Sequence, residues 1–230
     1  MFSSAIQRLN DRRDGAGDAG DDAGFTLIEL MVVLLILAIL LAIAIPTFLG
    51  VTKSANDRAT QSNLNTALVN AKSAFQSNSQ SYAYGTTGTA SQGTNALSLA
   101  STLNAAEPSL AFQTGAVPGA TSTTGSSLGQ AAISVQVSFD GSGLVLAELS
   151  KSTSNCFYII DNTSAITTAT QGNLPWALTG SAAVNPGFPQ TAGTWYGEAK
   201  NVTAANCNAS AAPAAAANSV VYQSNGFPSL

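Results

Sequence analysis

The hydrophobic residues of this 230-residue chain gather in one long run near its N-terminus. Residues 25–45 contain only two polar side chains, Thr26 and Glu29, and residues 30–45 contain none. A helix over this segment is about 31 Å long, which matches the roughly 30 Å hydrocarbon core of a bilayer. A helix on the surface of a globular core keeps a polar face, and this run has none beyond its first turn. The pattern therefore predicts a membrane-spanning helix over residues 25–45.

A hydrophilic segment, residues 1–24, precedes the apolar run and differs from an ordinary secretory signal. A secretory signal is cut after its apolar stretch, next to small residues. Here the small residues Ala23 and Gly24 come before that stretch. Cleavage after Gly24 would therefore remove a leader, residues 1–24, and leave the apolar helix on the mature chain.

Glu29 is the single charged side chain within residues 25–45. A carboxylate costs about 2.5–3.5 kcal/mol at the centre of a membrane helix and less near its end, so such groups are usually paired. Cleavage after Gly24 would create a cation, the free α-amine of Phe25, on the same helix face and equally accessible to a neighbouring copy of the helix. The alternative interpretation is an unpaired Glu29 that reaches the lipid headgroups.

The sequence Gly24-Phe25-Thr26-Leu27-Ile28-Glu29, followed by an apolar helix, resembles the N-terminal motif of type IV pilins. The resemblance implies that a prepilin peptidase cuts after Gly24 and methylates the amine of Phe25. It also implies that Glu29 neutralises the Phe25 amine of an adjacent subunit during assembly. Many pilin leaders are shorter and basic, whereas this leader contains five Asp and three Arg.

Pro46 matches the proline that many pilins carry at the end of the membrane segment, where the helix kinks or melts in the filament. Proline removes one helix hydrogen bond, and here its ring clashes with the carbonyl group of Ala42. Residues 46–50 and 55–59 are similar to those of pilins from Gram-positive actinobacteria.

Beyond Pro46, apolar residues recur every three or four positions through residues 47–76, which predicts an amphipathic continuation of the helix over residues 46–77. The predicted apolar stripe consists of Phe48, Val51, Ala55, Ala59, Leu64, Leu68, Ala71 and Phe75. Residues 78–130 are rich in Ser, Thr and Gly and predict a connecting region. Within it, the spacing over residues 96–106 predicts a short helix that ends before Pro108, and the nearby aromatic side chains are expected to anchor it: Tyr82, Tyr84 and Phe112.

Alternating apolar and polar residues predict four strands in the last part of the chain, residues 131–230. They cover residues 133–139, 144–149, 156–160 and, with a weaker pattern, 194–200, and a Gly-rich turn joins the first two. The expected fold is therefore α+β and pilin-like: a long N-terminal helical spine packed against a C-terminal antiparallel β-sheet.

Cys156 and Cys207 are the only cysteines. An even pair that follows a membrane helix on its external side predicts a disulfide bond. The similarity to the disulfide that bounds the C-terminal region of many pilins agrees with this pairing. Two reduced cysteines are the alternative.

The amino-acid composition argues against most kinds of catalytic site. The chain has no His, and only 9% of its residues are charged, against about 25% on average. Its carboxylates beyond the leader are scattered singly, and no phosphate-binding loop or nucleophile motif is present. We therefore expect no enzymatic activity, no cofactor and no metal, although Asp161-Asn162 could contribute to a calcium site as in some secretion pseudopilins. Scarce Lys and Arg argue against nucleic-acid binding.

The leading hypothesis is a structural subunit of a type IV pilus that forms a helical homopolymer. Its partners would be other copies of itself, prepilin peptidase, the assembly platform with its ATPase, and the cytoplasmic membrane before assembly into an extracellular filament. One alternative is a pseudopilin of a type II secretion system, and another is a minor tip pilin that binds a surface or DNA. Sequence alone does not distinguish motility from adhesion.

Overall fold

Helix α2, Leu27–Ser77, is the longest element of the chain. The computed structural model describes residues 25–84, 92–114, 132–138, 140–150, 152–165, 188–203, 206–209 and 220–228. The chain divides into two compact units, residues 1–49 and 50–230, and α2 contributes to both. A single helix in the described residues, α2, is long and apolar enough to cross a membrane. Gly24 and the rest of the predicted leader lie outside the described residues.

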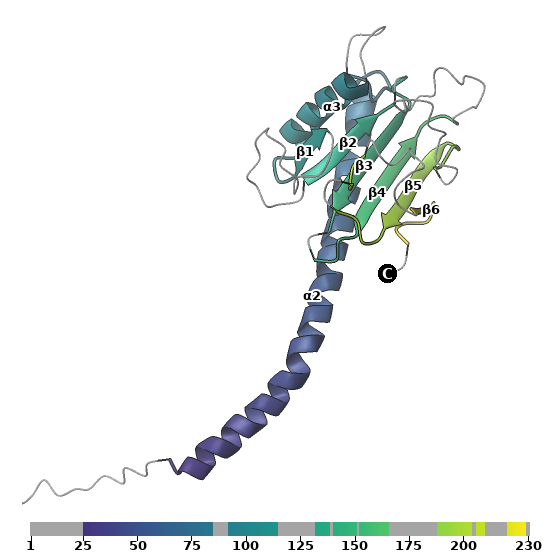
Figure 1. The fold of residues 1–230 in the computed structure, drawn as a ribbon. Helices are drawn as coiled ribbons and strands as arrows, with labels where there is room; N and C mark the ends of the chain where they lie inside the picture. Colours follow the sequence, from purple (N-terminus) through teal and green to yellow (C-terminus); the bar gives the residue numbers. More distant parts are fainter. Residues whose placement is uncertain are drawn as a thin grey trace, which may run out of the picture. The chain divides into compact units, whose positions relative to one another are not determined.

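A six-stranded sheet forms the centre of the second unit, with its strands in sequence order (Figure 1). The strands are β1 Ala111–Thr114, β2 Ala132–Val137, β3 Gly143–Leu149, β4 Cys156–Asn162, β5 Gly193–Ala199 and β6 Val221–Gln223. The second helix of the unit is α3, Gln92–Ala106, where the sequence predicts a short helix. The predicted α+β, pilin-like fold is confirmed.

The sheet differs from the prediction at its two edges. The four predicted strands are present as β2 to β5, but β1 and β6 are additional. They are four and three residues long, too short for a clear alternating pattern. β1 also pairs with β2 in parallel, so the sheet is mixed rather than purely antiparallel. A parallel pair needs a long connection, and the connection here is the Ser/Thr/Gly-rich segment 115–131.

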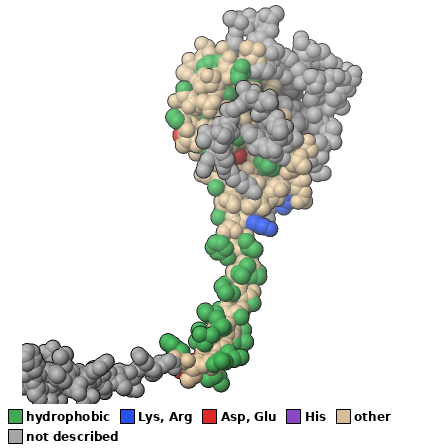
Figure 2. Space-filling view, turned by 60° about the vertical axis from the view of Figure 1, so that its left-hand side comes forward, with side chains coloured by type: hydrophobic (Ala, Val, Ile, Leu, Met, Phe, Trp, Pro, Cys, Tyr) green, Lys and Arg blue, Asp and Glu red, His purple; other side chains and the backbone are tan. Residues whose placement is uncertain are grey.

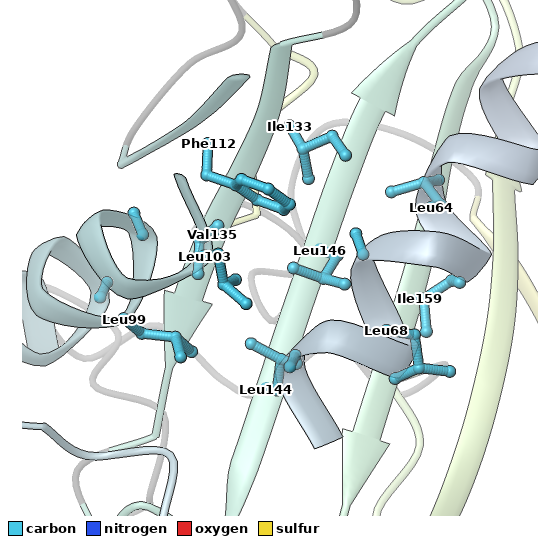
Figure 3. Packing of buried hydrophobic residues seen from close by; sticks show 14 of the residues in the cluster. Leu64, Leu68, Leu99, Leu103, Phe112, Ile133, Val135, Leu144, Leu146 and Ile159 are labelled. Carbon is cyan, nitrogen blue, oxygen red and sulfur yellow. The ribbon is translucent and has the colours of Figure 1, made fainter. Parts of the chain in front are cut away.

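Both helices cover one face of the sheet and build its main core (Figure 3). Leu64 and Leu68 of α2 point toward Leu146 and Ile159 at the centre of the sheet, and Leu99 of α3 packs over the β1–β2 side. The predicted anchors behave as expected, since Tyr82 and Phe112 are buried and Tyr84 packs against the same core. The first residue of this core on α2 is Leu64.

The buried face of α2 begins with polar residues, contrary to the predicted stripe. Asp57 and Thr60 are buried, whereas Ala55 and Ala59 are exposed. Leu64 fixes the face that meets the sheet, and at 3.6 residues per turn positions 60 and 57 share that face. Ala59 and Ala55 fall on the far side because they lie five and nine residues before Leu64. The stripe is therefore correct only from Leu64 onward.

The opposite face of the sheet is also covered. Ser134 and Gln136, the polar residues in the alternating pattern of β2, are buried there. A second cluster lies on this face and includes Tyr158, Ile160, Phe188 and both cysteines. Sequence reasoning missed this layer because Phe188 and the Cys207 segment come from irregular chain without a periodic pattern.

Candidate functional site: the N-terminal apolar helix

The start of α2 is closed by a reciprocal hydrogen-bonded cap. The backbone N–H and the hydroxyl of Thr26 donate to Oε2 of Glu29, at 2.9 and 2.8 Å. In return the backbone N–H of Glu29 donates to the Thr26 hydroxyl at 3.3 Å. A Thr at the N-cap with a Glu three residues later is a capping box, which satisfies backbone donors that a helix start leaves open. The Thr-x-x-Glu signal was present in the sequence, and sequence analysis assigned Glu29 no such role.

The described part of the first unit exposes all of its apolar side chains. Every residue from Phe25 to Gly50 is exposed, and Phe25 itself is 89% exposed. Figure 2 shows hydrophobic side chains along this part of the helix. Soluble monomers rarely expose a continuous apolar surface of this extent, so lipid or other protein must cover it. The candidate site is therefore an apolar helix surface that a single chain does not bury.

Pro46 lies inside α2, which continues as a helix on both sides of it. Proline cannot donate a hydrogen bond to the carbonyl group one turn earlier. The hydroxyl of Thr47 donates to the carbonyl oxygens of Ile43 and Ala44 in the same turn, at 3.2 and 2.9 Å, but not to that of Ala42, whose bond the proline removes. Ser and Thr side chains often supply such bonds beside a proline in membrane helices. Thr47 thus supports the helix at the point where proline weakens it.

Cys156 and Cys207 form a disulfide bond in the structure, with a separation of 51 residues along the chain. Both are fully buried, and the bond ties the start of β4 to residues 206–209. Beside it, the hydroxyl of Ser134 accepts a hydrogen bond from the Ala209 backbone at 3.0 Å. Burial raises the pKa of Tyr158 to about 12, although a hydrogen bond from the Asn208 backbone opposes that rise. The disulfide belongs to the second face of the sheet.

Asp161 and Asn162 make structural contacts within the described residues. Asp161 Oδ1 pairs with Nζ of Lys72 at 3.1 Å, and its Oδ2 accepts a bond of 2.6 Å from the Tyr82 hydroxyl. Burial first, then this bond and the Asp161 charge, raise the pKa of Tyr82. The amide of Asn162 donates to the carbonyl oxygen of Pro189 at 2.9 Å. Within the described ranges, no group of three or more His, Cys, Asp or Glu residues is placed to hold a metal ion.

The predicted site residues lie in both units of the chain. Glu29 lies at the first turn of α2 beside Phe25, and Pro46 lies about five turns further along the same helix. The cysteines belong to the second unit.

A group of buried acidic residues, Asp57, Glu148 and Glu198, was not predicted at all. Nothing in their local sequence marks them, because they come from a helix and two separate strands.

Comparison with known proteins gives one match, and it falls on this helix. The family model for the prokaryotic N-terminal methylation motif matches residues 21–45. No curated protein and no solved structure matches the chain. The matched segment contains the proposed processing junction, the capping box and the exposed apolar surface. Residues 21–45 therefore carry the type IV pilin signature, which together with the long apolar helix supports a pilin-like or pseudopilin-type protein.

Proposed function

We propose that this chain is a structural subunit of a type IV pilus. Prepilin peptidase cuts it after Gly24 and methylates the new amine of Phe25. The apolar helix then leaves the cytoplasmic membrane and packs with copies of itself in an extracellular filament, while the sheet domain remains outside. The observation that carries this proposal is the exposed apolar helix that coincides with the methylation motif.

The chemistry of residues 25–45 supports assembly as the role of this helix. An apolar surface is equally satisfied by lipid and by other apolar helices, so the helix can move from one environment to the other at little cost. Glu29 is the exception, because a carboxylate in an apolar filament needs a cation. We propose that the Phe25 amine of an adjacent subunit supplies that cation. Before assembly, the Thr26 cap holds the Glu29 carboxylate within its own chain.

The rest of the chain supports a structural role. In our proposal residues 1–24 are the leader, residues 25–45 the membrane and assembly helix, and residues 46–77 the amphipathic half of that helix. Residues 78–130 connect the helix to the sheet domain, residues 131–230. Pro46 and Thr47 allow local adjustment of the helix during assembly, and the disulfide Cys156–Cys207 stabilises the sheet domain outside the cell.

The abundance of the chain in filaments sheared from the cell surface tests the proposal. A major pilin dominates the sheared protein, as judged by stained gels and mass spectrometry of the bands. A pseudopilin of a type II secretion system is absent from sheared filaments and needed for protein export instead. A tip pilin is present in trace amounts. Absence of the chain from sheared filaments, in cells that express it, contradicts the proposal.

A further inference from the structure

The contact between α2 and the sheet is polar before it becomes apolar at Leu64. The amide of Asn56 donates to the Ser152 hydroxyl at 3.0 Å, and the hydroxyl of Thr153 donates to the Asp57 carboxylate at 2.5 Å. About two turns later, the amide of Asn63 donates to Glu148 Oε1 at 3.0 Å. Residues 56–63 of α2 are therefore held on the sheet domain by hydrogen bonds rather than by apolar packing.

Glu198 belongs to the same layer. Strand register places Glu148 of β3 opposite Phe157 of β4, and Phe157 opposite Glu198 of β5. Residues paired in this way share one face of a sheet, and Phe157 packs in the core formed with α2. Glu198 therefore points to the side of the sheet that α2 covers. Its next neighbour in the row is Val221 of β6.

Three carboxylates in this layer are almost completely buried. Asp57 and Glu148 are each 3% exposed, and Glu198 is 5% exposed. The Oε1 atom of Glu198 is shielded from solvent and makes no hydrogen bond. Burial of a carboxylate oxygen that accepts no hydrogen bond disfavours the anion more than the neutral acid. Glu198 is therefore a group that folding favours in its protonated form.

The titratable groups around Glu198 come from α2, from β3 and from the residue after β5. Asp57 of α2 and Glu148 of β3 are acidic, and Lys200, which follows β5, is basic. At this row β4 and β6 present Phe157 and Val221, which are uncharged. Lys53 and Arg58 of α2 are exposed. Burial raises the pKa of Glu198 above its ordinary value; Lys200 opposes that rise, and Asp57 adds to it.

We propose that Glu198, together with Asp57, forms a proton-sensitive latch that holds residues 56–63 of α2 on the sheet and releases them when Glu198 ionises. The latch is closed at low pH, when Glu198 is neutral. Ionisation of Glu198 adds a negative charge to the buried layer that also contains Asp57, and this opens the contact. Packing from Leu64 onward is apolar and stays closed.

The pH dependence has a defined sign. Burial raises the pKa of Glu198 in the closed state, and contact with solvent in the open state returns this pKa toward its ordinary value. Stabilisation by the latch is therefore complete below the ordinary pKa and is lost as pH rises through the raised pKa. Between these two values the open-to-closed ratio increases about tenfold per pH unit, and above the raised pKa it becomes constant.

Hydrogen exchange of the full chain in detergent micelles, followed by mass spectrometry across a pH series, tests the latch. Exchange rates are corrected for the intrinsic effect of pH. Peptides within residues 53–63 should lose protection as pH rises, while peptides within residues 64–77 keep theirs. Glu198→Gln should abolish the pH dependence because the amide cannot ionise. Glu107→Gln, which changes an acidic residue beside α3, is the matched control and should retain it.

Asp57→Asn provides a second test in case Glu198→Gln folds poorly. Removal of the neighbouring charge should lower the raised pKa of Glu198, so the rise in exchange should level off at a lower pH than in the unaltered chain. The proposal is overturned if residues 53–63 show no pH-dependent loss of protection, or if Glu198→Gln preserves that dependence. It is also overturned if residues 53–63 and 64–77 open together, since that indicates unfolding of the whole domain.

Discussion

The two units of this chain differ in the exposure of their apolar residues. In the described part of the first unit every apolar side chain of the helix is exposed, whereas the second unit buries its own in two layers around a sheet. The second unit can therefore be stable alone. The first unit needs lipid or other chains to cover its apolar side chains. Substitutions in the first unit should change assembly, and substitutions in the second should change stability.

Replacement of Glu29 should have the largest effect. Glu29→Val leaves the Phe25 amine of the neighbouring subunit buried without a partner, at a cost of about 3–5 kcal/mol per subunit. The yield of sheared filaments should fall at least about a hundredfold, while the chain remains membrane-inserted and cut after Gly24. Quantitative immunoblots of sheared and membrane fractions measure both quantities.

Glu29→Gln separates the charge of this residue from its capping role. Gln at this position can still close the capping box with Thr26, but it carries no charge. Assembly should therefore fail in Glu29→Gln and persist in Thr26→Ala, which loses the cap and keeps the charge. Normal filament yield from Glu29→Gln would show that charge neutralisation is not the role of this residue.

Loss of the disulfide should have the largest effect on the second unit. A closed loop with a separation of 51 residues stabilises a domain by about 4 kcal/mol. Cys156→Ser, Cys207→Ser and the double substitution should each lower the free energy of unfolding by this amount. Urea denaturation followed by tryptophan fluorescence provides the measurement. Two free thiols per subunit in unreduced filaments would contradict the bond and the external position of this domain.

A matched pair of leucines tests the contrast between the units directly. Leu64 is fully buried between α2 and the sheet, whereas Leu37 is exposed. Leu64→Ala should lower the free energy of unfolding of the sheet domain by about 2–5 kcal/mol, and Leu37→Ala should leave it unchanged. The same denaturation measurement applies to both. Equal losses from the two substitutions would mean that residues 27–49 also pack in a folded core of their own chain.

Gly197 provides a smaller perturbation at the edge of the sheet. A Cβ atom at this position would lie 2.6 Å from the ring of Tyr222, which covers Gly197 from β6. Gly197→Ala should displace this ring and loosen β6, at a cost of about 1–3 kcal/mol. Hydrogen exchange should increase in residues 220–228 and stay unchanged in β3. Unchanged protection of β6 would show that Tyr222 does not hold this edge.

The helices and central strands could be predicted from sequence because their patterns are local. The run over residues 25–45, the spacing in α3 and the alternation in β2 and β3 each specify an element without reference to the rest of the chain. The face of α2 was predicted incorrectly before Leu64, because only the position of the sheet selects between Ala59 and Thr60. Likewise, the burial of Glu198 depends on pairing with strands far away in sequence.

In the candidate site too, residues could be predicted from sequence where the pattern around them is local. Glu29 and its relation to Phe25 could be proposed from sequence because a lone carboxylate in an apolar run is conspicuous. The capping contact of Glu29 with Thr26 is also local and could have been found. Thr47 as a support for the proline-containing turn was not considered, although it adjoins Pro46. The acidic layer beneath α2 could not be found, since its members come together only in the folded domain.

The mass of the N-terminal peptide of the chain in sheared filaments tests the central claim most directly. The account predicts a peptide that begins at Phe25 and is one methyl group heavier than its sequence, with the extra mass on the α-amine. Fragmentation spectra locate that methyl group. A filament subunit that still carries residues 1–24, or that begins at a residue other than Phe25, would contradict the proposed processing and the role of Glu29 that depends on it.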